Sequence, residues 1–220
     1  MSAKSLIAVA ALVIAAPLGA QAKDATKGVT PAPLPPGWTM KMDPGSESLT
    51  ARFVKTANGF QVTSGGAAIY YTTSDAQAND KFITMADFQQ LKKNVGHGDH
   101  GEAFGLFAGG QNLDDPAKQT YYYFLVRQDG QFLINHRAGK EVHKIVDWTP
   151  NPAIVKFDDK PNASNSMEIR AGTDSVRFVV NGKVVHALPR KNIDLSGQTG
   201  FRVNHNLDVR IWNFMAMKGA

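Results

Sequence analysis

The sequence predicts an all-β fold, an antiparallel β-sandwich. Short apolar segments recur from Trp38 onward and are separated by clusters of glycine, asparagine and aspartate. Two dipeptides, Asp129-Gly130 and Asn181-Gly182, each lie between two apolar runs, which is the strongest short-range signal for a β-hairpin. No long segment carries a clean helical stripe of apolar residues. Short strands at such regular spacing are typical of two antiparallel sheets packed face to face.

Residues 1–22 have the pattern of a secretory signal peptide. Lys4 precedes an uncharged apolar run from Leu6 to Leu18, and the small residues Ala20 and Ala22 suit cleavage after position 22. The run is shorter than the roughly 20 residues of a membrane-spanning helix, so a retained anchor is the less favoured alternative. No cysteine follows the run, and lipidation would need one. We therefore expect a periplasmic or secreted protein without a membrane span in its mature form.

The composition limits the classes of partner. The chain has no cysteine, so its stability must come from a packed core, and thiolate metal sites are impossible. Cleavage would leave 23 basic and 19 acidic residues, and no run of five like charges occurs. We therefore expect neither nucleic-acid binding nor a polybasic membrane patch. The mild basic excess favours acidic polymers such as uronate-rich polysaccharides. The oligomeric state is not indicated.

The remaining chain divides into a tether and one domain. Residues 23–37 contain four prolines between Pro31 and Pro36, which favour an extended polyproline conformation. Residues 38–220 are long enough for a single β-sandwich core. Within them, residues 80–93 are predicted to form a strand with Phe82 and Phe88 on one side, although apolar spacing by three leaves a helix as the alternative.

The hairpin at Asp129-Gly130 predicts two largely apolar faces. A two-residue turn would pair Leu125 with Ile134 and Tyr123 with His136. One face should then line the core and the other a covered surface or a groove, because a one-sided sheet needs only one apolar face. The second face would carry Tyr122, Phe124, Val126, Leu133 and Arg137.

Three further turns complete the predicted strand order. The Asn181-Gly182 turn would place Arg177 and His186 opposite one another on one face. Residues 171–174 would form the loop of the preceding hairpin, and residues 204–206 would form a bend before the last strand. The other face of the Asn181-Gly182 hairpin would carry Val176, Phe178, Val180, Val185 and Ala187.

Several segments together resemble a known superfamily. They include His-Gly-Glu-Ala-Phe-Gly-Leu-Phe-Ala-Gly-Gly, Tyr-Tyr-Phe-Leu-Val-Arg-x-Asp-Gly-x-Phe, Phe-Val-Val-Asn-Gly-Lys-Val-Val and Gly-Phe-Arg-Val-Asn-His-Asn-Leu-Asp-Val. The pattern, from about Gly59 to Met217, resembles exported bacterial domains of the concanavalin A-like lectin/glucanase superfamily, especially laminin-G-type and 3-keto-disaccharide-hydrolase-like domains. The resemblance implies a jelly-roll sandwich. Because the shared motifs are architectural, it specifies the chemistry poorly.

The enzymes of that superfamily provide a test for catalysis. Laminarinase-type glycoside hydrolases carry a strand resembling Glu-x-Asp-x-x-Glu, whose carboxylates act as nucleophile and general acid. Here Glu102 is followed by apolar residues and glycine through Gly110, and Glu168 has no acidic residue two or four positions on. The glucanase motif is therefore absent. Carboxylates from separate strands could still converge, so a glycoside hydrolase or lyase stays open as the alternative.

The stretch NVGHGDHGEAFGLFAGG is a candidate metal site. His97, Asp99, His100 and Glu102 are ligand types for zinc or another divalent ion. Residues 94–101 are predicted to form a glycine-rich loop before a strand at 102–108. The alternative to a metal site is therefore an ordinary surface loop, in which such polar residues are common. Calcium is the second metal candidate, through oxygen ligands of Asn112, Asp114 and Asp115, which are also common turn formers.

Aromatic and cationic residues of the hairpins are the favoured binding candidates. Aromatic rings offer flat apolar surfaces to the C–H faces of sugars, while arginine and histidine hydrogen-bond hydroxyls. The alternative is that the aromatics fill the core. We therefore expect noncatalytic carbohydrate binding on a concave sheet, ahead of a hydrolase or lyase and of a structural adhesion module. The candidate ligand-binding residues are Tyr121, Tyr123, Arg127, His136, Trp148, Arg177 and His186.

Overall fold

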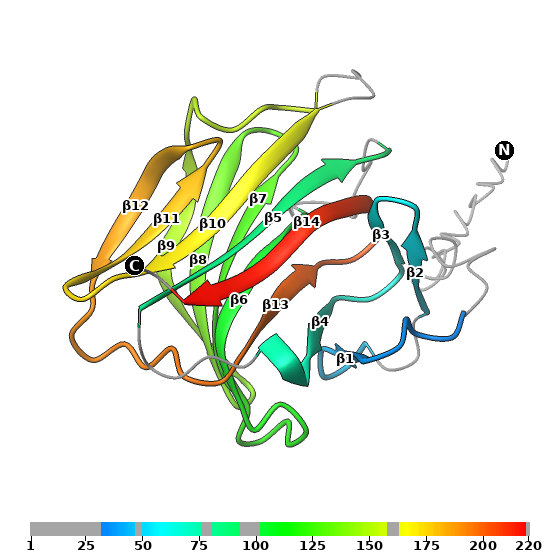
Figure 1. Ribbon diagram of the computed structural model, residues 1–220, viewed down its shortest axis with the longest axis horizontal. Coiled ribbons are helices and arrows are strands. Elements are labelled where there is room, and N and C mark those ends of the chain that lie inside the picture. The colour runs from blue at the N-terminus through cyan, green and yellow to red at the C-terminus, as the bar shows by residue number, and fades with distance from the viewer. Residues whose placement is uncertain (1–31, 47–49, 76–80, 93–101, 158–162, 219–220) are drawn as a thin grey trace, which may run out of the picture.

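The computed structural model describes residues 32–46, 50–75, 81–92, 102–157 and 163–218. These residues form two seven-stranded antiparallel sheets (Figure 1), so the expected antiparallel β-sandwich is confirmed. Sheet A has the order β1 (Trp38–Met42), β4 (Ala68–Thr72), β13 (Gln198–Val203), β6 (Ala103–Gln111), β7 (Thr120–Arg127), β8 (Gln131–Ala138) and β9 (Glu141–Pro150). Sheet B has the order β12 (Lys183–Pro189), β11 (Ser175–Val180), β10 (Ser164–Ala171), β5 (Phe82–Gln90), β14 (Asp208–Lys218), β3 (Gly59–Ser64) and β2 (Ala51–Thr56).

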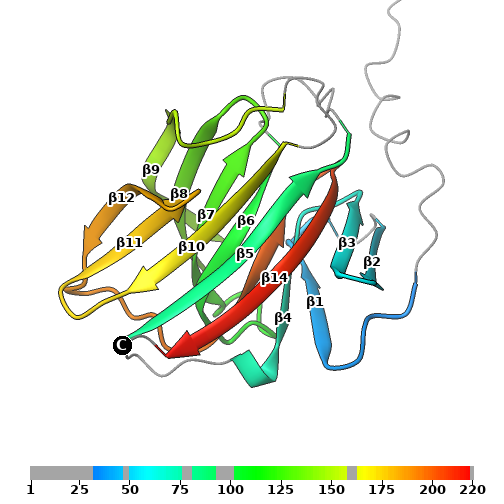
Figure 2. The same ribbon diagram turned by 45° about the horizontal axis from the view of Figure 1, so that its top comes forward.

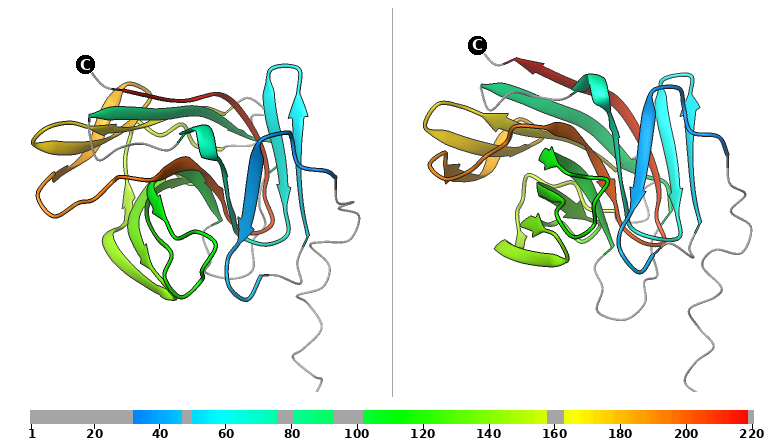
Figure 3. Two further views of the ribbon diagram at one scale, coloured as in Figure 1. Left: turned by 60° about the horizontal axis from the view of Figure 1, so that its bottom comes forward. Right: turned by 90° about the horizontal axis from the view of Figure 1, so that it is seen from below.

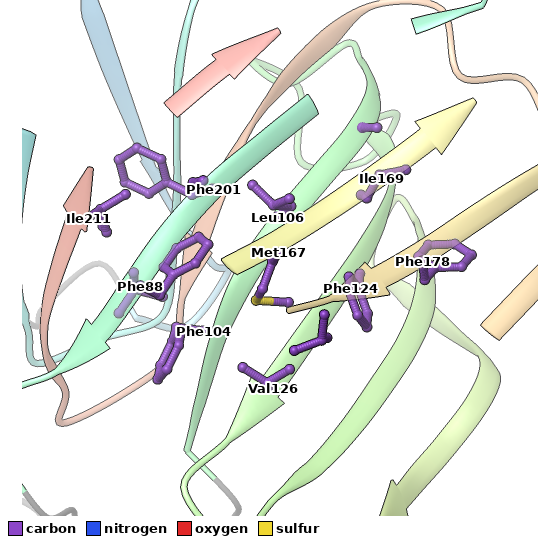
Figure 4. Packing of buried hydrophobic residues seen from close by; sticks show 14 of the residues in the cluster. Phe88, Phe104, Leu106, Phe124, Val126, Met167, Ile169, Phe178, Phe201 and Ile211 are labelled. Carbon is purple, nitrogen blue, oxygen red and sulfur yellow. The ribbon is translucent and has the colours of Figure 1, made fainter. Parts of the chain in front are cut away.

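The two sheets lie face to face and enclose the core, as the turned views show (Figure 2 and Figure 3). Aromatic and aliphatic side chains from both sheets meet between them (Figure 4). Phe88 of β5 stacks on Phe104 of β6 with ring centroids 5.4 Å apart. Along β5 every second residue from Phe82 to Phe88 is buried, which confirms the strand over the helical alternative. A short 3₁₀ helix, η1 (Thr73–Asp75), follows β4.

The β7–β8 hairpin has a different register from the predicted one. Tyr123 pairs with Asn135 rather than with His136, because three residues, 128–130, join the strands. Gly130 takes a positive φ of 85°, and its N–H donates to the carbonyl of Arg127 at 3.0 Å. Three-residue hairpin loops have this geometry. The shift of one residue moves His136 to the face opposite that of Tyr123.

The β11–β12 hairpin turns at Asn181-Gly182 as predicted, with φ of 50° and 74°. A β-bulge beyond the turn, however, pairs Phe178 with His186 and Arg177 with Ala187. The predicted opposition of Arg177 and His186 is therefore wrong, since the extra residue of a bulge shifts every pair beyond it.

The other expected turns and the β6 strand are found. Residues 172–174 join β10 to β11, and Asn206, with φ of 55°, lies in the turn that takes the chain from sheet A to sheet B. In β6, Phe104, Leu106 and Ala108 lie in the core between the sheets. Residues 1–31 and 94–101, which hold the expected signal peptide, most of the tether and the glycine-rich loop, lie outside the described residues.

No helix in the described part of the chain is long and apolar enough to cross a membrane.

Gly105 lets β6 and β7 pack closely. A Cβ at this position would lie 2.1 Å from the carbonyl oxygen of Phe124, a backbone atom that cannot move aside alone. We expect Gly105→Ala to lower the free energy of unfolding by about 2–3 kcal/mol, as overpacking in a filled core does. Denaturant titration of the variant checks this. Gly172→Ala is the control, because its nearest atom, the Ser175 carbonyl oxygen, is 3.1 Å away; equal losses for both variants would contradict the packing argument.

Candidate functional site

The outer face of sheet A, which points away from sheet B, is concave. Asp43 follows β1, whereas Arg137 lies on β8, five strands away in the sheet. In a flat sheet five strand spacings amount to about 24 Å, which two side chains cannot span. Arg137 Nη2 nevertheless lies 3.1 Å from Asp43 Oδ2. Sheet A therefore curls around its outer face and brings its edge close to β8.

An ion-pair network occupies this concave face. Arg202 of β13 donates from Nη1 to Asp43 Oδ1 at 2.7 Å and from Nη2 to Oδ2 at 2.5 Å. Arg137 shares the same carboxylate. All three side chains have low exposure, 6% for Arg202, 10% for Arg137 and 18% for Asp43. Two-point contact between a guanidinium and a carboxylate fixes the geometry of both groups.

The charges of the two arginines keep Asp43 ionised. Burial by itself would raise the pKa of the Asp43 carboxyl, but Arg202 and then Arg137 outweigh it, so the pKa lies below its usual value. No sequence pattern predicts a functional role for Asp43, because Asp43-Pro44-Gly45 is typical of an ordinary turn. Its role follows only from the curl of the sheet.

Tyr121 and Tyr123, both candidate binding residues, extend this network on the same face. The Tyr121 hydroxyl accepts from Arg202 Nη1 at 3.3 Å, and the Arg202 guanidinium lies 5.0 Å from the centroid of the Tyr123 ring. Asn135 Nδ2 donates to the Tyr123 hydroxyl at 2.9 Å. Burial raises the pKa of Tyr121. The rings pack with a second apolar cluster made of Ile69, Tyr71, Ala103, Phe107, Leu113, Leu125 and Leu133.

Arg127 and Trp148, also candidate residues, form the accessible part of this face. The Arg127 guanidinium lies 4.7 Å from the centroid of the Trp148 ring. An ion pair with Asp129, 2.6 Å between Arg127 Nη2 and Asp129 Oδ2, fixes the position of the guanidinium. A register shift in the β8–β9 pairing gives β9 one extra residue next to Trp148. Trp148 thereby packs against the concave-face cluster while keeping part of its ring exposed.

Three buried polar atoms of the network have unused hydrogen-bonding capacity. Asn135 Oδ1, Arg137 Nε and Arg202 Nε have no hydrogen-bond partner within the part of the chain that the structure describes. Most buried polar groups in proteins are partnered. This acceptor and these two donors lie beneath the accessible surface of the concave face.

Glu102 directly precedes β6 and is paired with a histidine. His205 Nδ1 lies 3.6 Å from Glu102 Oε2, and the side chains are 45% and 5% exposed respectively. Glu102 is the main cause of the raised pKa of His205, and Asp43 contributes in the same direction. Sequence reasoning missed His205, which it assigned only to a turn.

The structure describes only some of the residues of the two candidate metal sites. His97, Asp99 and His100 lie outside the described residues, so their relation to Glu102 is not established. Among the described residues no group of three or more His, Asp and Glu side chains is placed to hold a metal ion. Of the calcium candidates, Asp114 pairs with Lys41 at 2.5 Å and Asp115 accepts from the Ala117 N–H at 2.9 Å. These contacts favour the turn interpretation.

Three candidate binding residues lie elsewhere. His136 stacks on Tyr122 with centroids 4.3 Å apart, on the side of sheet A that faces the core, and burial lowers its pKa. His186 pairs with Phe178 at the edge of the core. Arg177 is exposed on the outer face of sheet B. The expected single face is therefore wrong for these three: the register shift in the β7–β8 hairpin moves His136 to the core side of sheet A, whereas Arg177 and His186 belong to sheet B.

The fold and the concave sheet define a galectin-like β-sandwich, which confirms the architecture expected from the superfamily resemblance. The chain is similar in structure to a carbohydrate-binding module, CBM66, from Bacillus subtilis, with a TM-score of 0.61 and 14% identity over 83% of this chain and 96% of that one. A Bacillus subtilis protein of unknown function with a galectin-like fold has a TM-score of 0.55 and 12% identity over 82% and 89%.

A candidate glycosyl hydrolase from Parabacteroides distasonis has a TM-score of 0.51 and 13% identity over 83% of this chain and 99% of its own. No protein-family model and no curated protein matches the chain. At such identities the likeness is one of fold.

Removing the Asp43 carboxylate should leave two buried arginines without their shared partner. We expect Asp43→Asn to lower the free energy of unfolding by about 3–5 kcal/mol, the cost of breaking a buried ion pair. Because the folded pKa of Asp43 is lowered, its stabilisation is present above the unfolded value near 3.9 and is lost as pH falls through the folded value. Denaturant titration between about pH 6 and pH 2 should therefore show a shallower acid loss in the variant.

Asp147→Asn is the matched control. Asp147 pairs with Lys144 at 2.7 Å, but both side chains are exposed, so its replacement should change stability little. Equal effects of the two variants would contradict the structural role assigned to Asp43.

Proposed function

We propose that the protein is a noncatalytic carbohydrate-binding module that holds a glycan on the concave face of sheet A. The observation that carries this proposal is the arrangement on that face. An accessible Trp148–Arg127 pair lies beside a buried network of tyrosine, arginine and asparagine side chains.

Each part of the arrangement has a chemical role toward a sugar. The exposed part of the Trp148 ring provides a flat apolar surface for the C–H face of a pyranose or furanose. The Arg127 guanidinium beside it can donate hydrogen bonds to hydroxyl groups. Asp129 fixes Arg127 in place, so little side-chain entropy is lost on binding.

The buried network supports the site from beneath. Arg202 and Asn135 hold Tyr121 and Tyr123 in fixed orientations, so the floor of the face is rigid before a ligand arrives. The structural likeness to a carbohydrate-binding module supports the same function, as a likeness of fold. With the signal-peptide pattern at residues 1–22, we propose that binding takes place in the periplasm or outside the cell.

Trp148→Ala tests the site directly. A glycan array probed with residues 23–220 should identify ligands, and calorimetry should then give a Kd for the best of them. We expect Trp148→Ala to weaken that Kd roughly tenfold or more, because aromatic anchors contribute about 1.4 kcal/mol or more at binding sites. The fold should persist, since Trp148 is only partly buried.

Trp212→Ala provides the matched control, because Trp212 lies on β14 of the opposite sheet, beside a separate small pocket. It should leave the Kd unchanged. The absence of any array ligand, or equal losses in both variants, would rule out glycan binding at this face.

A hydrolase is the second candidate, and the Glu102–His205 pair favours it. The Glu102 carboxylate lies next to His205, whose pKa it raises, and the charge of Asp43 in the concave-face network acts on the same histidine. Each array ligand is therefore incubated with the protein and assayed for reducing-sugar release. If the wild type releases reducing sugar, and Glu102→Gln abolishes this release without changing the Kd, the protein is a hydrolase and not a noncatalytic binding module. Under our proposal no sugar is released.

A further inference from the structure

The outer face of sheet B carries an unusual pair of like charges. Arg170 of β10 and Arg177 of β11 are direct partners in the antiparallel pairing, and Gly172 to Asp174 connect their strands. Directly opposed side chains lie about 5 Å apart at Cβ, and like charges in that position destabilise a sheet. Such an arrangement needs a compensating negative charge.

Only one of the two arginines has a carboxylate partner. Arg170 donates from Nε to Glu168 Oε2 at 2.7 Å and from Nη2 to Oε1 at 3.0 Å. Arg177 is exposed and has no ion-pair partner among the described residues. Within the described ranges, one of the paired positive charges therefore has no carboxylate bonded to it.

The arginine pair lies in a groove. The hollow, of about 460 Å³, is lined by Lys81 and Phe82 at the start of β5, by residues 170–175 of the β10–β11 hairpin, and by Arg177. Lys81, Arg170 and Arg177 face one acidic side chain in the lining, Asp174. Counting described residues alone, these three cations outnumber by one the two carboxylates, Asp174 and Glu168, and Glu168 is bonded to Arg170. Thr173 and Ser175 add hydroxyl groups to its wall.

We propose that this groove binds an oxyanion group, carboxylate or sulfate, of an acidic polysaccharide. Two guanidinium groups on neighbouring strands can each donate to one oxyanion, and such charge-assisted hydrogen bonds are about twice as strong as neutral ones. The groove is open, so it admits a side group on a long chain. It lies on the opposite side of the sandwich from the concave face of sheet A, and it does not depend on the function proposed for that face.

The lining favours a polysaccharide over a nucleic acid. Single-stranded nucleic acids bind through exposed aromatic rings on which bases stack. The only aromatic residue lining the described groove is Phe82, which is 1% exposed. Carboxylate and sulfate groups need only the cations and hydroxyls that are present.

Arg177→Gln tests the site through its coupling to stability. An anion that binds only the folded protein raises its melting temperature. Excluded sulfate stabilises folded proteins in general, and this effect should be the same for the wild type and for Arg177→Gln. Sodium sulfate, compared with sodium chloride of equal ionic strength, should therefore raise the Tm of the wild-type chain more than that of Arg177→Gln. Without sulfate the variant should be at least as stable as the wild type, because the like-charge pair is gone. Equal sulfate-dependent rises in the Tm of the wild type and of Arg177→Gln would overturn the proposal.

Lys183→Gln is the matched control. It also removes one exposed positive charge from sheet B, but Lys183 pairs with Val180 at the other end of the β11–β12 hairpin. It should keep the sulfate-specific rise in Tm. A loss equal to that of Arg177→Gln would mean that net charge, not the groove, causes the effect, and would overturn the site.

Calorimetry with polygalacturonate, dextran sulfate and neutral dextran identifies the source of the oxyanion. We expect the wild type to bind at least one acidic polymer, uronate or sulfated, and Arg177→Gln to bind it roughly tenfold more weakly, as the loss of a charged hydrogen bond implies. Unchanged binding by the variant, or binding to anionic phospholipid vesicles and to neither polymer, would overturn the proposal. Arg177→Gln should bind the array ligands of the concave face with the same Kd as the wild type. The groove proposal and the concave-face proposal can therefore be refuted separately.

Discussion

The architecture of the concave face depends on one carboxylate. Asp43, placed after the edge strand β1, is held by arginines of β13 and β8, and this contact is possible only if sheet A curls. A buried ion pair costs desolvation energy that its attraction barely repays, so its value lies in geometry more than in stability. The same arginines orient the two tyrosines beneath the accessible tryptophan. Curvature, rigidity and the orientation of the candidate site thus share one cause.

The two outer faces of the sandwich differ in chemical character. On the concave face the charges are buried and closely matched, and the accessible surface is an aromatic ring next to a fixed guanidinium. On the opposite face the arginines are exposed and directly opposed, and they line an open groove. The first arrangement suits the hydroxyl and C–H groups of a neutral sugar, and the second suits a charged substituent. A single polymer that carries both kinds of group could be held by both.

Sequence reasoning predicted the fold class, a strand within residues 80–93 and both hairpins, because short apolar runs and positive-φ dipeptides are local signals. It misplaced His136 and His186, since a three-residue loop and a β-bulge each shift register by one residue, and a register error changes the face of every residue beyond it. Arg177 lies on the predicted face of its strand, but that strand belongs to sheet B, and local signals do not assign a strand to a sheet. Asp43, Arg202 and His205 were missed because their partners lie far away in the chain, and only the curl of the sheet brings them together. Trp148, Arg127 and the two tyrosines do lie on one face, as predicted. The predicted pairing of Tyr123 with His136, however, was wrong.

The positions of β13 and β14 have a consequence for how the chain folds. These two strands come last in the sequence, yet β13 lies between β4 and β6, and β14 lies between β3 and β5. Neither sheet can become continuous until the final part of the polypeptide is available, so most of the stabilising contacts join distant parts of the chain, an arrangement associated with slow folding. A chain truncated before residue 198 would expose four unpaired strand edges in the interior of its sheets and should aggregate rather than form a smaller domain.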